Sequence, residues 1–124
     1  MGQMDGRKIL VVEDDFFIAE DIAESLRQFG AEIIGPAASV AEALDLASRG
    51  AQVDGAVLDV NLRREKTYPV AEALQRRAVP FVFLTGYDRD ALDARFRETP
   101  ILNKPVNMDL LVSALAQREG DERD

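Results

Sequence analysis

The sequence predicts an α/β fold in which a doubly wound sheet of five parallel strands is covered by five helices. Three observations predict it. Short apolar, β-branched runs alternate five times with segments of helical periodicity. These runs show no alternation of apolar and polar residues, as expected for strands buried on both faces. The chain has 124 residues, of which 47% are apolar, which is enough for the core of one domain.

The first half of the chain predicts three strands and two helices. The expected strands are Lys8–Val12, Glu32–Gly35 and Ala56–Val60. Between the first two, apolar residues recur at helical spacing: Ile18, Ile22, Leu26 and Phe29. Gly30 ends this helix. Ser39 and Glu42 stand three residues apart, as in a capping box that starts the second helix, and Gly50 ends it.

The second half predicts two more strands, Phe81–Thr85 and Ile101–Asn103, and three helices. Pro69 suits the first turn of the third helix. Residues Gly86–Thr99 are expected to form a short or mobile helix, because only two apolar side chains there share a face. Asn107 is expected to cap the last helix.

The ends of the chain carry little apolar sequence. Residues 1–7 predict a flexible N-terminal arm, residues 8–118 the domain, and residues 119–124 a flexible acidic tail with nothing to bury. The longest apolar runs are only strand-sized, so no membrane span is expected. The N-terminus also lacks the apolar region of a signal peptide, and we expect a cytoplasmic protein.

Composition excludes several kinds of site. The chain has no Cys and no His, so disulfides, thiolate zinc sites, histidine metal cages and Ser-His-Asp triads are excluded. Lys and Arg number 15 against 23 Asp and Glu, a net charge of −8. This acidity argues against binding nucleic acid, which favours a basic face, and suits binding of a hard cation.

Polar side chains stand at the carboxyl ends of four of the five expected strands. Ligands of open α/β sheets bind beyond these ends. The residues there are Glu13, Asp14 and Asp15 after the first strand, Asp59 in the third, Thr85 in the fourth and Lys104 after the fifth. Carboxylates at short range bind Mg²⁺, and Asp59 can attack a phosphoryl group as the nucleophile. Thr85 and Lys104 can bind phosphoryl oxygens. This set predicts a phosphoryl-accepting site.

Four ordered fragments carry a family resemblance. They are Ile9–Asp15, Leu58–Leu62, Leu84–Gly86 and Asn103–Pro105. Together they resemble a response-regulator receiver domain, which implies the flavodoxin-like strand order 2-1-3-4-5. The resemblance implies that Asp59 is the phosphoacceptor, that Thr85 is the switch hydroxyl and that Lys104 binds the phosphate.

The resemblance also implies the ligands of the Mg²⁺ ion. Asp14 and Asp59 would bind it directly, the backbone carbonyl of Asn61 would be a further ligand, and Glu13 would act through a water molecule. Pro105 is a candidate for a cis peptide bond. The chain would then be no enzyme beyond self-phosphorylation from a phosphodonor and slow autodephosphorylation.

A narrower resemblance involves Tyr68–Ala71 and Pro80–Tyr87, which are similar to stand-alone receivers of the FAT-GUY (PFxFATGY) type. It implies a sensor histidine kinase of the HWE or a related type, or a phosphotransfer protein, as the partner. Such a chain is expected to act by protein contact, as a monomer or weak dimer. The sequence departs from the pattern at Leu84, where the motif has Ala, and at Glu13, where most receivers have Asp.

Two side chains are expected to set the lifetime of the phosphorylated state. Asn61 and Tyr87 each lie two residues beyond a site residue, Asp59 and Thr85. Both should therefore flank the acyl phosphate and control how water reaches phosphorus. The alternative for Tyr87 is that it serves only in packing.

Three other functions remain to be weighed. A hydrolase of the haloacid-dehalogenase kind needs a second Asp two residues after the nucleophile, where this chain has Asn61. A nucleotide-binding domain would carry Gly-x-Gly-x-x-Gly or Gly-Lys-Ser/Thr, and neither motif occurs. A degenerate receiver that binds partners without phosphorylation remains open because of Glu13.

Overall fold

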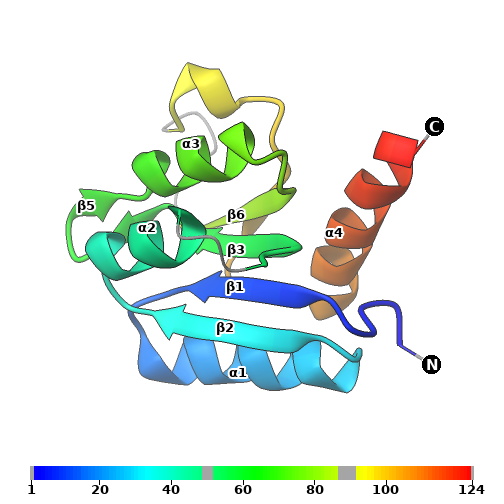
Figure 1. Cartoon of the computed structure of the whole chain (residues 1–124). Coiled ribbons are helices and arrows are strands. Elements are labelled where there is room, and N and C mark those ends of the chain that lie inside the picture. Colours follow the sequence, from blue (N-terminus) through cyan, green and yellow to red (C-terminus); the bar gives the residue numbers. More distant parts are fainter. Residues whose placement is uncertain (1, 49–51, 87–91, 124) are drawn as a thin grey trace.

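The computed structural model describes residues 2–48, 52–86 and 92–123. Its centre is a parallel sheet in the order β2-β1-β3-β6-β7 (Figure 1). The five strands are β1 (Lys8–Val12), β2 (Glu32–Ala37), β3 (Gly55–Asp59), β6 (Phe81–Thr85) and β7 (Ile101–Asn103). The predicted doubly wound sheet and its strand order are confirmed, with β6 and β7 as the predicted fourth and fifth strands.

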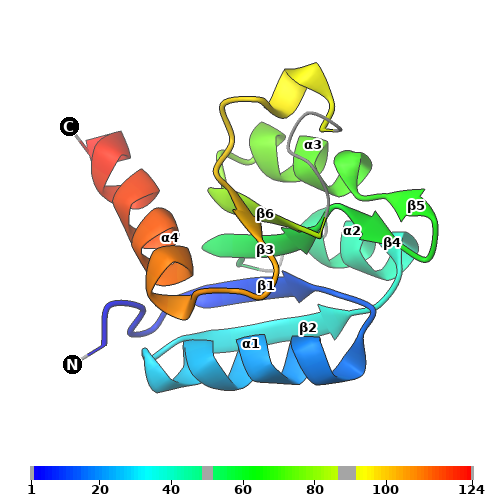
Figure 2. The ribbon, with the colours of Figure 1, turned by 180° about the vertical axis from the view of Figure 1, so that it is seen from behind.

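Helices cover both faces of this sheet (Figures 1 and 2). One face is covered by α1 (Phe16–Gln28) and α4 (Met108–Arg123), and the other by α2 (Val40–Ser48) and α3 (Tyr68–Arg76). Because alternate strand residues point to opposite faces, Val57 packs with the α1–α4 core, whereas Leu58 packs with the α2–α3 core. The two cores hold the strand ends in fixed positions.

The described residues contain four α-helices rather than the five expected. Where the sequence predicted a helix over Gly86–Thr99, the described part, residues 92–99, forms a 3₁₀ turn (η2, Ala94–Phe96). Phe96 is buried and stacks on Tyr68, with ring centroids 5.3 Å apart. Asp93 caps the turn by accepting the N–H of Arg95. Two buried side chains, Leu92 and Phe96, anchor this segment in the α2–α3 core without a helical repeat.

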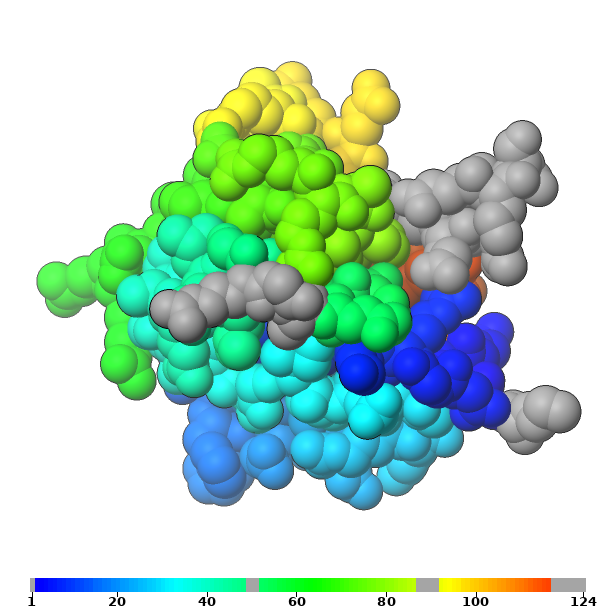
Figure 3. All heavy atoms as spheres, viewed as in Figure 1, coloured from blue at the N-terminus to red at the C-terminus, as the bar shows by residue number. Residues whose placement is uncertain are grey.

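The segment expected to be a polar loop, Asn61–Thr67, contains a short antiparallel hairpin. Its strands are β4 (Asn61–Leu62) and β5 (Glu65–Lys66). The two-residue turn consists of Arg63 and Arg64, with φ angles of 47° and 74°. A left-handed pair is typical of hairpin turns but usually requires Asn or Gly, so two Arg residues do not signal this turn. The hairpin protrudes from the molecule (Figure 3).

Both ends of the chain carry structure that the sequence did not predict. Within the predicted arm, the Met4 side chain is fully buried in the α1–α4 core, and its N–H donates to the Phe29 carbonyl at 2.9 Å. One apolar side chain and one backbone hydrogen bond therefore attach the expected arm to the domain at Met4. Helix α4 also continues to Arg123, through most of the expected tail, whose Glu and Arg residues favour helix.

No described helix is both long enough and apolar enough to cross a membrane.

We expect Met4→Ala to lower the free energy of unfolding by about 2 kcal/mol or more, because it empties a fully buried site. Urea denaturation monitored by circular dichroism measures it. Gln3→Ala, at the exposed neighbouring position, is the control and should leave stability unchanged. Equal stability of both variants would show that Met4 does not anchor the N-terminal arm.

Candidate functional site

Acidic residues from two strand ends meet at one edge of the sheet. Glu13 follows β1 and is 2% exposed, and Asp59 ends β3 and is 7% exposed. With the partly buried Asp14, each offers a carboxylate oxygen, and these oxygens all lie within 4.8 Å of one another. Parallel strands bring their carboxyl ends to the same edge, so the cluster follows directly from the topology.

Asp15, the third acid of the first loop, has a different task. Its Oδ1 accepts the N–H groups of Phe17 and Ile18 at 3.0 and 3.1 Å, which caps α1. Its own N–H donates to Glu13 Oε2 at 3.0 Å. The run of three acids is thus divided: two belong to the cluster and one starts the helix.

One ammonium group lies between two of the carboxylates. Lys104 Nζ is 2.8 Å from Asp59 Oδ2 and 2.8 Å from Glu13 Oε1. The backbone N–H of Lys104 donates to the Thr85 carbonyl at 2.9 Å, which fixes the loop after β7 against the end of β6. The Lys104–Pro105 peptide bond is cis, as predicted for Pro105. A second cis bond, Gly35–Pro36, was not predicted.

Burial and pairing change the ionisation of this cluster. Burial is the main cause that raises the pKa of Glu13, and the Lys104 ammonium and the Asp15 N–H only partly offset it. For Lys104, burial alone would lower the pKa, but the contacts with Asp59 and Glu13 hold it above its ordinary value. Lys104 therefore stays charged at neutral pH.

The cluster has the chemistry of a site for a hard divalent cation. Three carboxylates against one ammonium leave two net negative charges. Glu13 Oε1 is buried, and its contact is the ion pair with Lys104 Nζ at 2.8 Å. Mg²⁺ takes oxygen ligands of this kind, so the residues present fit the predicted ion.

The remaining predicted residues lie around the cluster. Thr85 is buried at the end of β6. The Asn61 N–H donates to Asp59 Oδ1 at 3.3 Å, which places the Asn61 backbone beside the Asp59 carboxylate. The Arg63 N–H donates to Asp14 Oδ2 at 3.1 Å, so the hairpin turn contacts the cluster. Tyr87 lies outside the described residues.

Sequence reasoning missed Thr67. This residue is fully buried, and its hydroxyl donates to the Asp59 carbonyl at 2.7 Å. A Thr directly before the helix-starting Tyr68-Pro69 suggests a cap, and the sequence carries no signal of its contact with a residue eight positions earlier.

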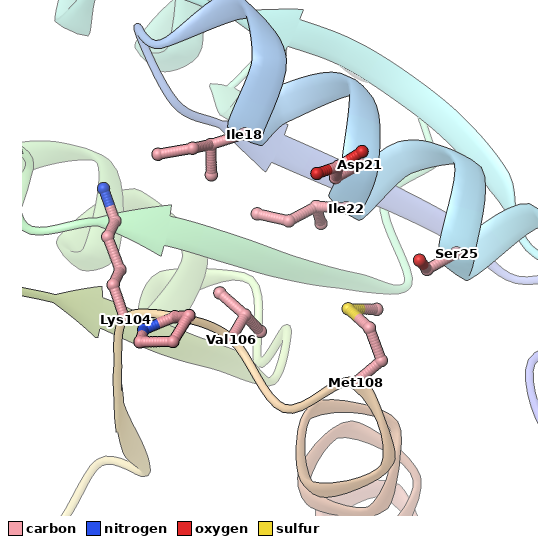
Figure 4. A pocket seen from close by; sticks show the side chains of 8 residues that line it. Ile18, Asp21, Ile22, Ser25, Lys104, Val106 and Met108 are labelled. Carbon is pink, nitrogen blue, oxygen red and sulfur yellow. The ribbon is translucent and has the colours of Figure 1, made fainter.

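A groove of about 590 Å³ begins beside the cluster and runs between α1 and the loop after β7 (Figure 4). Lys104 lies at one end of the groove, and the apolar lining of the groove includes Ile18, Ile22 and Met108. Two exposed aromatic residues, Phe16 and Phe17, lie in the first turn of the same helix. The acidic site therefore adjoins an apolar surface.

A family model described as the response regulator receiver domain matches residues 9–116. A curated relative, the transcriptional regulatory protein PdtaR of Mycobacterium tuberculosis, is 34% identical over 113 residues, which cover 88% of this chain and 55% of the relative. The chain thus spans about half the length of the curated relatives it matches.

Solved structures resemble the whole domain. The solution structure of SdrG from Sphingomonas melonis Fr1 is 42% identical, with a TM-score of 0.81 over 96% of this chain and 99% of that chain. A BeF3-activated conformation of SdrG, attributed to Pseudomonas melonis Fr1, is 44% identical, with a TM-score of 0.71 over 88% of this chain and 92% of that chain.

We expect Lys104→Met to destabilise the protein by roughly 2–4 kcal/mol at neutral pH without divalent cations, because it leaves Glu13 buried without its cation. Because the pKa of Glu13 is already raised, this cost should shrink as the pH falls and Glu13 is protonated. Chemical denaturation at several pH values measures it.

The control is Lys66→Met, which removes an exposed lysine and should change stability little. Adding Glu13→Gln to Lys104→Met should recover part of the loss. A cost that is equally large at every pH, or that the double variant does not reduce, would show that Glu13 and Lys104 are not coupled in this way.

Proposed function

This chain belongs to the response regulator receiver domain family of two-component signalling, and we propose that it accepts a phosphoryl group on Asp59 from the phosphohistidine of a histidine kinase, with Mg²⁺ bound. The carboxylates of Glu13, Asp14 and Asp59, gathered within 4.8 Å beside the Lys104 ammonium, carry this proposal. The degenerate receiver is the alternative that the experiment below tests.

In the proposed reaction an oxygen of the Asp59 carboxylate bonds to phosphorus while the P–N bond of the phosphohistidine breaks. The electron pair of that bond returns to the imidazole ring, which takes a proton from water, and an acyl phosphate remains on Asp59. Bound Mg²⁺ screens the repulsion between the anionic nucleophile and the phosphoryl oxygens.

The Lys104 ammonium neutralises Asp59 before transfer and can turn to a phosphoryl oxygen afterwards, because its three N–H groups are not fixed in one plane. The Thr85 hydroxyl, at the neighbouring strand end, would donate to another phosphoryl oxygen.

The cation would be held by Asp14, Asp59 and the backbone carbonyl of Asn61, with Glu13 acting through a water molecule. The contacts of Glu13 support the indirect role. Its Oε2 already accepts the Asp15 N–H, and its Oε1 contacts Lys104. Because both oxygens have partners, the carboxylate is less suited to direct contact with the cation. Mg²⁺ commonly keeps several waters in protein sites.

We further propose that the domain signals or relays by protein contact in the cytoplasm, as a monomer or weak dimer, and that it is no enzyme beyond self-phosphorylation and slow autodephosphorylation. The kinase would be of the HWE or a related type, or a phosphotransfer protein would take its place, as the FAT-GUY-like residues suggest. SdrG, at 44% identity, has a BeF3-activated conformation, which supports the proposal that this domain can be activated.

Incubation with acetyl phosphate and Mg²⁺ should add the mass of one phosphoryl group, measured by intact-protein mass spectrometry. Asp59→Asn should abolish the gain, because an amide cannot act as the nucleophile. Asp14→Asn should reduce it at least tenfold by weakening the cation site. Asp15→Asn is the matched control, since Asn also caps helices, and should behave like wild type.

A wild-type chain that gains no mass from acetyl phosphate or from a kinase, yet still binds a partner, would favour the degenerate receiver.

We expect Asn61→Ala to speed decay of the phosphorylated protein, by roughly threefold to tenfold, because a smaller side chain beside Asp59 opens the path of the attacking water. Loss of the acyl phosphate after removal of the donor gives the rate. Lys66→Ala controls for disturbance of the hairpin, since Lys66 pairs with Asn61. Tyr87→Ala should act in the same direction, and unchanged rates in both Asn61→Ala and Tyr87→Ala would contradict the proposed lifetime control.

A further inference from the structure

Four polar residues are buried in the described part of the chain: Glu13, Asp59, Thr67 and Thr85. Three of them belong to the site proposed above, and Thr67 is the fourth. A buried hydroxyl needs a hydrogen-bond partner, and the identity of that partner indicates what the residue holds in place.

The ordinary explanation for Thr67 is a helix cap, because it stands directly before α3 at the N-cap position. The structure excludes this role for the hydroxyl, since the Thr67 side chain makes no capping hydrogen bond. It points instead to the end of β3, where Oγ1 donates to the Asp59 carbonyl at 2.7 Å and lies 3.3 Å from the Val60 carbonyl.

The backbone of Thr67 holds the same segment. Its N–H donates to the Val60 carbonyl at 2.9 Å, while the Val60 N–H donates to Leu84 of the next strand at 3.0 Å. The peptide units that follow the Asp59 Cα are therefore tied to β6 on one side and to Thr67 on the other. The hydroxyl is the only part of this arrangement that a side-chain substitution can remove.

The orientation of these peptide units determines the orientation of the Asp59 carboxylate. The Val60 carbonyl, which also contacts Thr67, belongs to the same peptide unit as the Asn61 N–H. Rotation of the two peptide units after Asp59 would therefore also turn the Asn61 N–H, which donates to Asp59 Oδ1. The carboxylate would then lose its present orientation, in which Oδ2 contacts Lys104. Partners of ligating residues that fix their orientation commonly change metal affinity 10–100-fold when removed.

We propose that Thr67 is a positioning residue for the acceptor site, whose hydroxyl holds the backbone from Asp59 to Asn61 so that the Asp59 carboxylate and the Asn61 carbonyl are oriented for Mg²⁺ and phosphoryl binding. The inference rests on the proposed function and extends it to a residue that touches neither the cation nor the phosphoryl group.

The test compares three variants in the full chain. Thr67→Val keeps the shape of the side chain and removes the hydroxyl. Thr67→Ser keeps the hydroxyl and removes a methyl group. Tyr68→Phe is the matched control, because it deletes the hydroxyl of the adjacent residue, which accepts the Asp93 N–H away from the acceptor carboxylate.

Three quantities are measured on the folded protein. They are the Mg²⁺ dissociation constant by calorimetry, the rate of phosphorylation by acetyl phosphate at saturating Mg²⁺, and hydrogen exchange of the Asn61 amide without metal. We expect Thr67→Val to weaken Mg²⁺ binding about tenfold, to slow phosphorylation at least as much, and to speed exchange at Asn61. Thr67→Ser should recover most of each effect, and Tyr68→Phe should match wild type.

The outcomes separate this inference from the function it rests on. If wild type binds Mg²⁺ and is phosphorylated but Thr67→Val matches it in both, Thr67 is merely structural and the inference is wrong. A lower melting temperature without these changes leads to the same conclusion. If wild type is not phosphorylated, the proposed function fails, while Mg²⁺ affinity and exchange at Asn61 still decide whether Thr67 orients the carboxylate.

Discussion

The ammonium group of Lys104 balances two carboxylates that the fold buries at the edge of its sheet. Glu13 and Asp59 stand at the ends of neighbouring parallel strands. Their carboxylates therefore lie at the same edge of the sheet, where both contact Lys104. Burial penalises each charge, so the pair requires a cation within contact distance. The loop after β7 positions the Lys104 ammonium. This loop contains the cis peptide bond at Pro105, and the Lys104 N–H donates to the Thr85 carbonyl.

The balance of charge between Lys104 and the carboxylates also explains why the site can still attract a divalent cation. One ammonium does not neutralise three carboxylates, so the cluster keeps an attraction for a divalent ion. At the same time Lys104 already occupies the side of Asp59 on which a phosphoryl oxygen would develop charge. The departure from the usual receiver sequence at Glu13 fits this arrangement, because its longer side chain reaches both Lys104 and the Asp15 N–H.

The sequence predicted the parts of the fold in which local pattern and tertiary structure agree. Buried strands have apolar runs, and residues directly after them must lie at the sheet edge, which is why Asp14, Asp59 and Lys104 could be assigned. The failures have a common physical cause. Met4, Phe96 and Thr67 are each fixed by a few contacts with residues distant in sequence, and such contacts leave no periodicity. The Arg63–Arg64 turn was not predicted for another reason. Its backbone is left-handed, whereas Arg ordinarily prefers negative φ angles.

Both described ends of the chain lie at the edge of the sheet opposite the acidic cluster (Figure 1). Gly2 precedes β1, and α4 lies on the side of the molecule at which the strands begin. An anchor at either end, such as an affinity handle, a fluorophore or a fused polypeptide, would therefore sit on the far side of the molecule. The domain can be immobilised or joined to other proteins through its ends while the edge with Asp59 faces outward to meet its partner.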